Sequence, residues 1–141
     1  MDAAKCLEFV RELRSLNHVL DARLNEGLRP LGISCVQADA LMALHELQPC
    51  TLKTLSAHLI AESGHPSRLI SRMKKNGLVD VKPSAADGRA MLISLTDQGE
   101  RLAMQSSQIR QGIINELDLD VQDIIDATKF LKTVAKQVSA Q

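Results

Sequence analysis

The chain has 141 residues and a mass of 15.4 kDa, about the size of one domain. Hydrophobic residues make up 45% and charged residues 24%, which excludes a disordered or fibrous chain, and an aromatic content of 1% disfavours stacking on single-stranded bases. The 17 basic and 17 acidic residues cancel to a formal net charge of zero, and that average alone argues against nucleic-acid binding.

No basic, apolar leader opens the sequence, and no apolar stretch approaches the roughly 20 residues that span a bilayer. We therefore expect a soluble, cytoplasmic protein without membrane contact. The three cysteines lack C-x-x-C spacing and no two histidines are four residues apart, so no metal or other cofactor is predicted. A thiol enzyme would need an activated cysteine with a resolving partner, and no such pair is evident, so no enzyme activity is predicted.

The first predicted element is a long amphipathic helix. Apolar residues recur at steps of three and four from Cys6 to Leu28, and Pro30 and Gly32 end the pattern.

Two shorter helices follow. Ser34 and Gln37 have the spacing of a capping box, which predicts a second helix from Ser34 to about Gln48. Thr51 caps a short third helix that ends near residues 60–62.

A fourth helix is predicted to begin at a Ser63 cap, with Pro66 tolerated in its first turn. Asn76 and Gly77 end it, because glycine readily takes the left-handed conformation after a helix. The third and fourth helices together predict a helix-turn-helix.

After Leu78 the apolar period changes to two, which predicts a hairpin of residues 79–82 and 91–95. Its loop, residues 83–90, offers Arg89 at the tip. We expect Asp87 to orient the Arg89 side chain through a charge-assisted bond and Gly88 to allow a tight turn.

Two helices are predicted to complete the chain, the fifth capped by Thr96 and the sixth by Asp118 or Asp120. Their expected buried stripes are Leu102, Ile109, Ile113 and Leu117 on the fifth helix, and Ile124, Thr128, Leu131, Ala135 and Val138 on the sixth.

Charge is unevenly distributed along the chain. Residues 63–93 hold six basic and two acidic residues, whereas residues 97–126 hold seven acidic and two basic ones. The middle segment is therefore predicted to contact anions.

On the fourth helix, His65, Arg68, Arg72 and Lys75 fall within an arc of about 80°. Such a face fits the major groove of duplex DNA, where arginine binds guanine and lysine neutralises phosphate. A solvated basic surface, common on any helix, is the alternative.

Three motifs resemble the MarR family of winged-helix transcriptional regulators. They are LSAHLIAESGHPSRLISRMKKNGLV at 55–79, DGR at 87–89 and ISLTDQG at 93–99. The resemblance implies a mainly α fold with a small β-hairpin wing, in which residues 33–96 form the winged helix-turn-helix and residues 1–32 and 97–141 form dimerisation helices. All 141 residues then make a single domain.

The implied function is that of a homodimeric, sequence-specific DNA-binding regulator, more often a repressor in this family, that recognises a pseudo-palindromic duplex. Ser67, Arg68 and Ser71 match the family's base-facing positions, Arg89 its wing arginine and Asp87 the aspartate beside it. The candidate DNA-binding residues are Ser63, His65, Ser67, Arg68, Ser71, Arg72, Lys74, Lys75, Lys82, Asp87 and Arg89.

Family members lose DNA affinity when a small phenolic or carboxylate ligand binds, or when a cysteine is oxidised. The sequence offers Cys6 on the first helix and Cys35 at the start of the second, where the helix dipole favours a lower thiol pKa. Small buried or incidental thiols are the alternative. A winged-helix module that binds protein and not DNA is the alternative function. The operator, the effector and the direction of regulation do not follow from the sequence.

Overall fold

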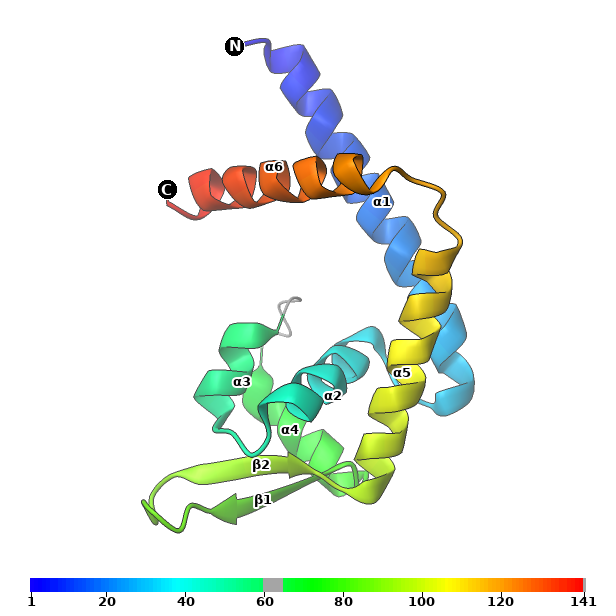
Figure 1. Cartoon of the computed structure of the whole chain (residues 1–141). Coiled ribbons are helices and arrows are strands. Elements are labelled where there is room, and N and C mark those ends of the chain that lie inside the picture. The colour runs from blue at the N-terminus through cyan, green and yellow to red at the C-terminus, as the bar shows by residue number, and fades with distance from the viewer. Residues whose placement is uncertain (60–64, 141) are drawn as a thin grey trace.

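The computed structural model describes residues 1–59 and 65–140. A body made of α2–α4 and the hairpin lies at one end of the molecule, and α5 runs from it towards α1 and α6 (Figure 1). The predicted fold class, mainly α with one β-hairpin, is confirmed. The elements are α1 (Ala3–Leu28), the short 3-10 helix η1 (Arg29–Leu31), α2 (Cys35–Leu47), α3 (Leu52–His58), α4 (Pro66–Lys75), β1 (Val79–Pro83), β2 (Met91–Leu95), α5 (Asp97–Asn115) and α6 (Val121–Ser139).

Most predicted helix ends are confirmed. The Ser34 hydroxyl accepts from the Gln37 N–H at 3.2 Å, and the Gln37 side chain accepts from the Ser34 N–H at 3.3 Å, as a capping box requires. Gly32 ends η1 with a φ of 71°. The predicted caps Thr51, Thr96 and Asp120 each accept from the first turn of their helix.

The core lies where α2, α3, α4 and the hairpin meet. Leu41, Leu44, Leu55 and Met73 are fully buried there, and Val79 joins them from β1. A core of this kind fixes α4 through its inner side and leaves the opposite side free.

The hairpin is antiparallel, with Val79 paired with Leu95 and Pro83 with Met91. On its other edge, β2 pairs with Cys50, which follows α2 in the chain. Ile93 N–H donates to Cys50 O at 2.7 Å, and Cys50 N–H donates to Ile93 O at 3.1 Å. The connection between α2 and α3 therefore holds β2 from outside the hairpin.

The buried side of α5 differs from the prediction. Gly99, Ala103 and Ser106 are buried against the body. Leu102, Ile109 and Ile113 are only half-buried and Leu117 is exposed, so the expected stripe is wrong for this subunit. Small side chains let α2 approach α5 closely, and the larger apolar ones are left at the sides.

The expected stripe of α6 is exposed within one subunit, because α6 crosses α1 away from the body (Figure 1), and its burial against a second copy stays a prediction. Its contact with α1 includes the edge-on pair Phe9 and Phe130, whose ring centroids are 5.4 Å apart. No described helix is long and apolar enough to cross a membrane. Many large apolar side chains on α1, the end of α5, the connection from α5 to α6, and α6 are exposed: Leu7, Val10, Leu16, Val19, Ile114, Leu117, Leu119, Val121, Ile124, Ile125, Phe130, Leu131 and Val138.

Candidate nucleic-acid interface

Helix α4 has one buried and one exposed side. Leu69, Ile70 and Met73 anchor it in the core. No ion pair within the described part of the chain involves its cations. The exposed side carries the predicted residues Ser67, Arg68, Ser71, Arg72, Lys74 and Lys75.

The predicted start of α4 is wrong. The helix begins at Pro66, with the exposed His65 at the cap position and no side-chain cap bond, whereas Ser63 lies outside the described residues. Proline at the first helical position disfavours helical geometry in the residue before it, so His65 stays outside the helix.

The end of α4 matches the prediction. Gly77 has a φ of 76°, its N–H donates to Lys74 O at 3.0 Å, and Leu78 N–H donates to Met73 O at 2.9 Å. These two bonds close the helix and direct the chain into β1.

The hairpin places Lys82 on β1 and Asp87 and Arg89 in the loop, all exposed, at the end of the hairpin remote from α5 (Figure 1). Asp87 accepts from the Arg89 backbone N–H at 3.0 Å, and no ion pair among the described residues joins its carboxylate to the guanidinium, so Asp87 holds the backbone of Arg89 and the expected side-chain pairing is wrong. The tight turn predicted at Gly88 is confirmed, because the Ala90 N–H donates to Asp87 O at 3.0 Å across Gly88 and Arg89, although Gly88 does not have a positive φ. Ser84 shapes the loop instead by accepting from two backbone N–H groups, those of Ala86 and Asp87.

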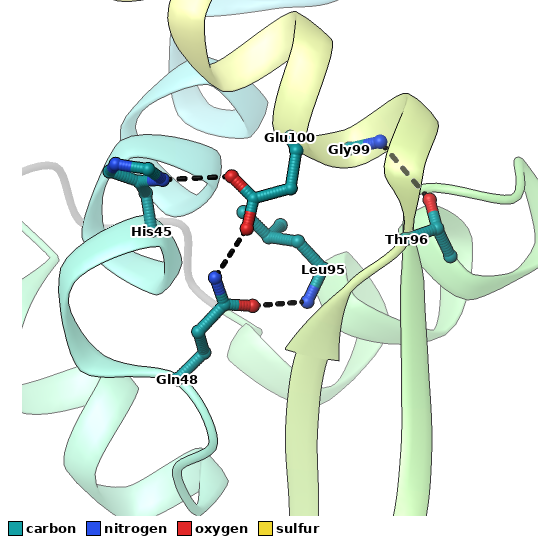
Figure 2. Close-up of polar contacts among 6 residues, drawn as sticks. All are labelled: His45, Gln48, Leu95, Thr96, Gly99 and Glu100. Carbon is teal, nitrogen blue, oxygen red and sulfur yellow. Dashed lines mark hydrogen bonds and ion pairs between the residues drawn. The ribbon is translucent and has the colours of Figure 1, made fainter.

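The start of α5 contacts the end of α4 directly. Thr96 N–H donates to Leu78 O at 3.1 Å, and the Thr96 hydroxyl donates to Gly77 O at 2.6 Å. The same hydroxyl accepts from Gly99 N–H at 3.0 Å (Figure 2). A Cβ on Gly99 would lie 2.1 Å from Leu78 O. The T-x-x-G motif therefore packs α5 onto the segment that leaves α4.

A second polar cluster, which sequence reasoning missed, joins α2, β2 and α5 (Figure 2). Glu100 accepts from the Gln48 amide at 2.5 Å, its other oxygen lies 2.8 Å from His45 Nδ1, and the Gln48 oxygen accepts from Leu95 N–H at 2.8 Å. The hydrogen bonds from Gln48 and His45 lower the pKa of Glu100. We call His45, Gln48, Glu100 and Leu95 the Gln48 bridge. The hydrogen bonds of this bridge join residues that are 47 to 55 positions apart in the sequence, so no local sequence pattern indicates them.

A cavity of about 430 Å³ lies between α2, α3 and α5 and was also missed by the sequence analysis. Its polar lining includes His45, His58, Glu46 and Arg110, and no phenylalanine, tyrosine or tryptophan is among the described residues that line it. Within the described part of the chain, no three histidine, cysteine or carboxylate residues lie together as metal ligands would.

The cysteines differ in exposure. Cys6 is exposed, Cys35 is half-buried and Cys50 is buried. Burial, followed by the charges of Asp21 and Asp39, raises the pKa of Cys35, so the expected lowering by the helix dipole is wrong. Burial also raises the pKa of Cys50.

Comparisons with known proteins agree with this geometry. A winged helix DNA-binding domain model matches residues 35–99. The organic hydroperoxide resistance transcriptional regulator of Bacillus subtilis is 35% identical over 87 residues, which cover 62% of this chain and 59% of that regulator. The HTH-type transcriptional regulator YsmB of Bacillus subtilis is 30% identical over 118 residues, 81% of each protein.

Among solved structures, a mutant MarR from E. coli complexed with operator DNA superposes with a TM-score of 0.77 at 25% identity, covering 92% of this chain and 95% of that one. The chain spans less than two thirds of the hydroperoxide regulator's length and most of that of YsmB. These relatives are transcriptional regulators and not enzymes.

Proposed function

Since this chain belongs to the MarR family of winged-helix transcriptional regulators, we propose that it is a homodimeric repressor of a pseudo-palindromic DNA site. The observation that carries the proposal is the exposed basic side of α4, whose cations form no ion pair within the described residues. Unpaired arginine and lysine on a rigid helix are available to a polyanion without first breaking internal contacts.

The proposal divides the exposed residues by role. Ser67, Arg68 and Ser71 contact base edges in the major groove, and Arg89 enters the minor groove. Asp87 acts on the loop backbone, consistent with its bond to the Arg89 N–H. The phosphate contacts are assigned to His65, Arg72, Lys74, Lys75 and Lys82, and Ser63 is kept as a candidate contact next to the helix start.

The proposed dimer interface uses residues 1–32 and 97–141. Apolar side chains on α1 and α6 that are 40–71% exposed in one subunit, such as Leu7 and Leu131, are costly to leave in water. A second copy related by a two-fold axis buries the same surface on both subunits.

DNA titration at several salt concentrations tests the proposal. If each subunit contacts about four phosphates, the log–log slope of affinity against salt is about −7 for the dimer. Arg68→Ala is expected to flatten sequence preference, whereas the matched variant Lys75→Ala weakens binding to all sequences alike and reduces the slope by about one per subunit.

Salt-independent binding, or no retardation of any duplex from a randomised pool, would refute the proposal. Capture of a protein partner together with absent DNA binding would favour the protein-binding alternative.

Release of DNA by a small molecule is the second part of the proposal. The cavity beside His45 is within the usual size range of ligand sites and adjoins both α2 and α5. An effector there is expected to raise the melting temperature and to lower DNA affinity. Release by oxidation at Cys6 or Cys35 is the other route, and it is refuted if peroxide treatment leaves DNA binding unchanged.

A further inference from the structure

The outer edge of β2 is held at two points. Ile93 exchanges two backbone hydrogen bonds with Cys50 on the side of β2 away from β1. The N–H of Leu95, two residues along, points the same way because strand geometry repeats every second residue. Gln48 accepts that N–H at 2.8 Å through its side chain. Beyond its pairing with β1, β2 is thus attached to the rest of the body at two positions along the strand, which together restrict its direction more than one would.

The second contact, from Leu95 N–H to the Gln48 side chain, uses the two different ends of the Gln48 amide. Leu95 N–H can only donate, and the ionised carboxylate of Glu100 can only accept. An amide is the side chain that offers an oxygen to the first and an N–H to the second, which fixes the orientation of Gln48 between them (Figure 2).

Glu100 is itself held in place. It lies in the first turn of α5, its N–H donates to Thr96 O at 2.8 Å, and its second carboxylate oxygen contacts His45 on α2. The direction of β2 therefore depends on contacts with both α2 and α5, and not on the hairpin alone.

A small change in the direction of β2 at Leu95 produces a large displacement at the tip of the hairpin. At about 3.4 Å per residue, the six residues from Leu95 to Arg89 span about 20 Å. A tilt of about 10° at Leu95 then moves Arg89 by about 3.5 Å, which exceeds the length of a hydrogen bond.

We infer that Gln48 and Glu100 are positioning residues for DNA binding, which set the direction of the hairpin and thereby place Arg89 against the duplex. The inference rests on the proposed function, because it needs Arg89 to contact DNA.

A double-mutant cycle tests it, with a duplex selected by the unmodified protein from a randomised pool and affinities measured at low salt. Gln48→Ala is expected to weaken binding about tenfold in the parent and less than about twofold when Arg89 is already alanine. In the matched background Lys75→Ala, the loss stays about tenfold, because a phosphate contact from α4 does not depend on the hairpin.

If Gln48→Ala lowers DNA affinity equally in the Arg89→Ala and Lys75→Ala backgrounds, the inference is overturned and the proposed function is left intact. The same holds if the Gln48→Ala variant binds DNA as tightly as the parent. Failure of the parent to bind any duplex refutes the proposed function and this inference with it.

A second pair of variants separates positioning from folding. Glu100→Gln keeps an oxygen that accepts from Gln48 and is expected to bind DNA within about twofold of the parent, whereas Glu100→Ala loses about tenfold. Urea unfolding measures the free energy of unfolding of each variant. A loss of DNA affinity that results only from lower stability is identified in this way. A Glu100→Gln variant as weak as Glu100→Ala would contradict the positioning role.

Discussion

Replacing Gly99 by alanine is expected to destabilise the fold strongly. The new Cβ would lie 2.1 Å from the carbonyl oxygen of Leu78, so backbone atoms must separate by about 1.3 Å to restore ordinary contact. The same oxygen accepts from Thr96 N–H at 3.1 Å, so the shift also weakens the junction between α4 and α5.

The cost follows from the kind of atom that must move. Overpacking costs about 1–3 kcal/mol when side chains can adjust, and a backbone carbonyl held by a hydrogen bond adjusts least, so we expect about 3 kcal/mol. For a chain of this length each kcal/mol corresponds to about 3–4 °C, which gives a fall in Tm of about 10 °C.

Thermal unfolding followed by circular dichroism, at one fixed protein concentration, measures the effect. Gly88→Ala is the matched control, because nothing lies within 4 Å of a Cβ there and its φ is not positive. It is expected to be neutral or to stabilise by up to about 1 kcal/mol. A Gly99→Ala protein that melts with the parent, or a Gly88→Ala protein that falls as far, would refute the packing argument.

Four further outcomes are expected. Folding lowers the pKa of Glu100, so its ionised carboxylate stabilises the fold above its ordinary pKa of 4.5, and this contribution is lost as the pH falls through the pKa of the folded state. The difference in free energy of unfolding between the parent and Glu100→Gln should therefore be constant near neutral pH and shrink below about pH 4.5, as measured by urea titrations. Iodoacetamide at neutral pH should label the exposed Cys6 well before Cys35, whose raised pKa leaves less thiolate; equal rates in peptide mass spectrometry would contradict this. Leu131→Asp on α6 should convert the proposed dimer to monomer in sedimentation equilibrium, and an unchanged dimer mass would place the interface elsewhere. Ser106→Ala should raise the free energy of unfolding by about 1 kcal/mol, because the buried Ser106 hydroxyl has no hydrogen-bond partner in the described residues; a loss of stability would reveal a partner.

Features specified by near neighbours could be predicted from the sequence. Ser34 and Gln37 are three residues apart, and the glycine that ends α4 adjoins it, so these signals need no knowledge of the fold. The start of α4 was misplaced because Ser63 is a good cap by type, whereas Pro66 decides the geometry.

Features specified by distant partners could not be predicted. The large apolar residues of α5 suggested its buried side, yet its buried residues are Gly99, Ala103 and Ser106, whose small size gives no hydrophobic signal. Gln48 and Glu100 meet across 52 positions, and only the packed fold brings them together.

The direct packing of Gly99 on Leu78 has a consequence for the choice of operator. Because α5 begins against the segment that leaves α4, the orientation of α4 is coupled to that of α5. In a two-fold dimer, the separation of the two recognition helices then depends on the angle at which the α1, α5 and α6 layers of the subunits cross. If the proposed dimer forms, we therefore expect preference between half-sites of different spacing to depend on residues that do not touch DNA.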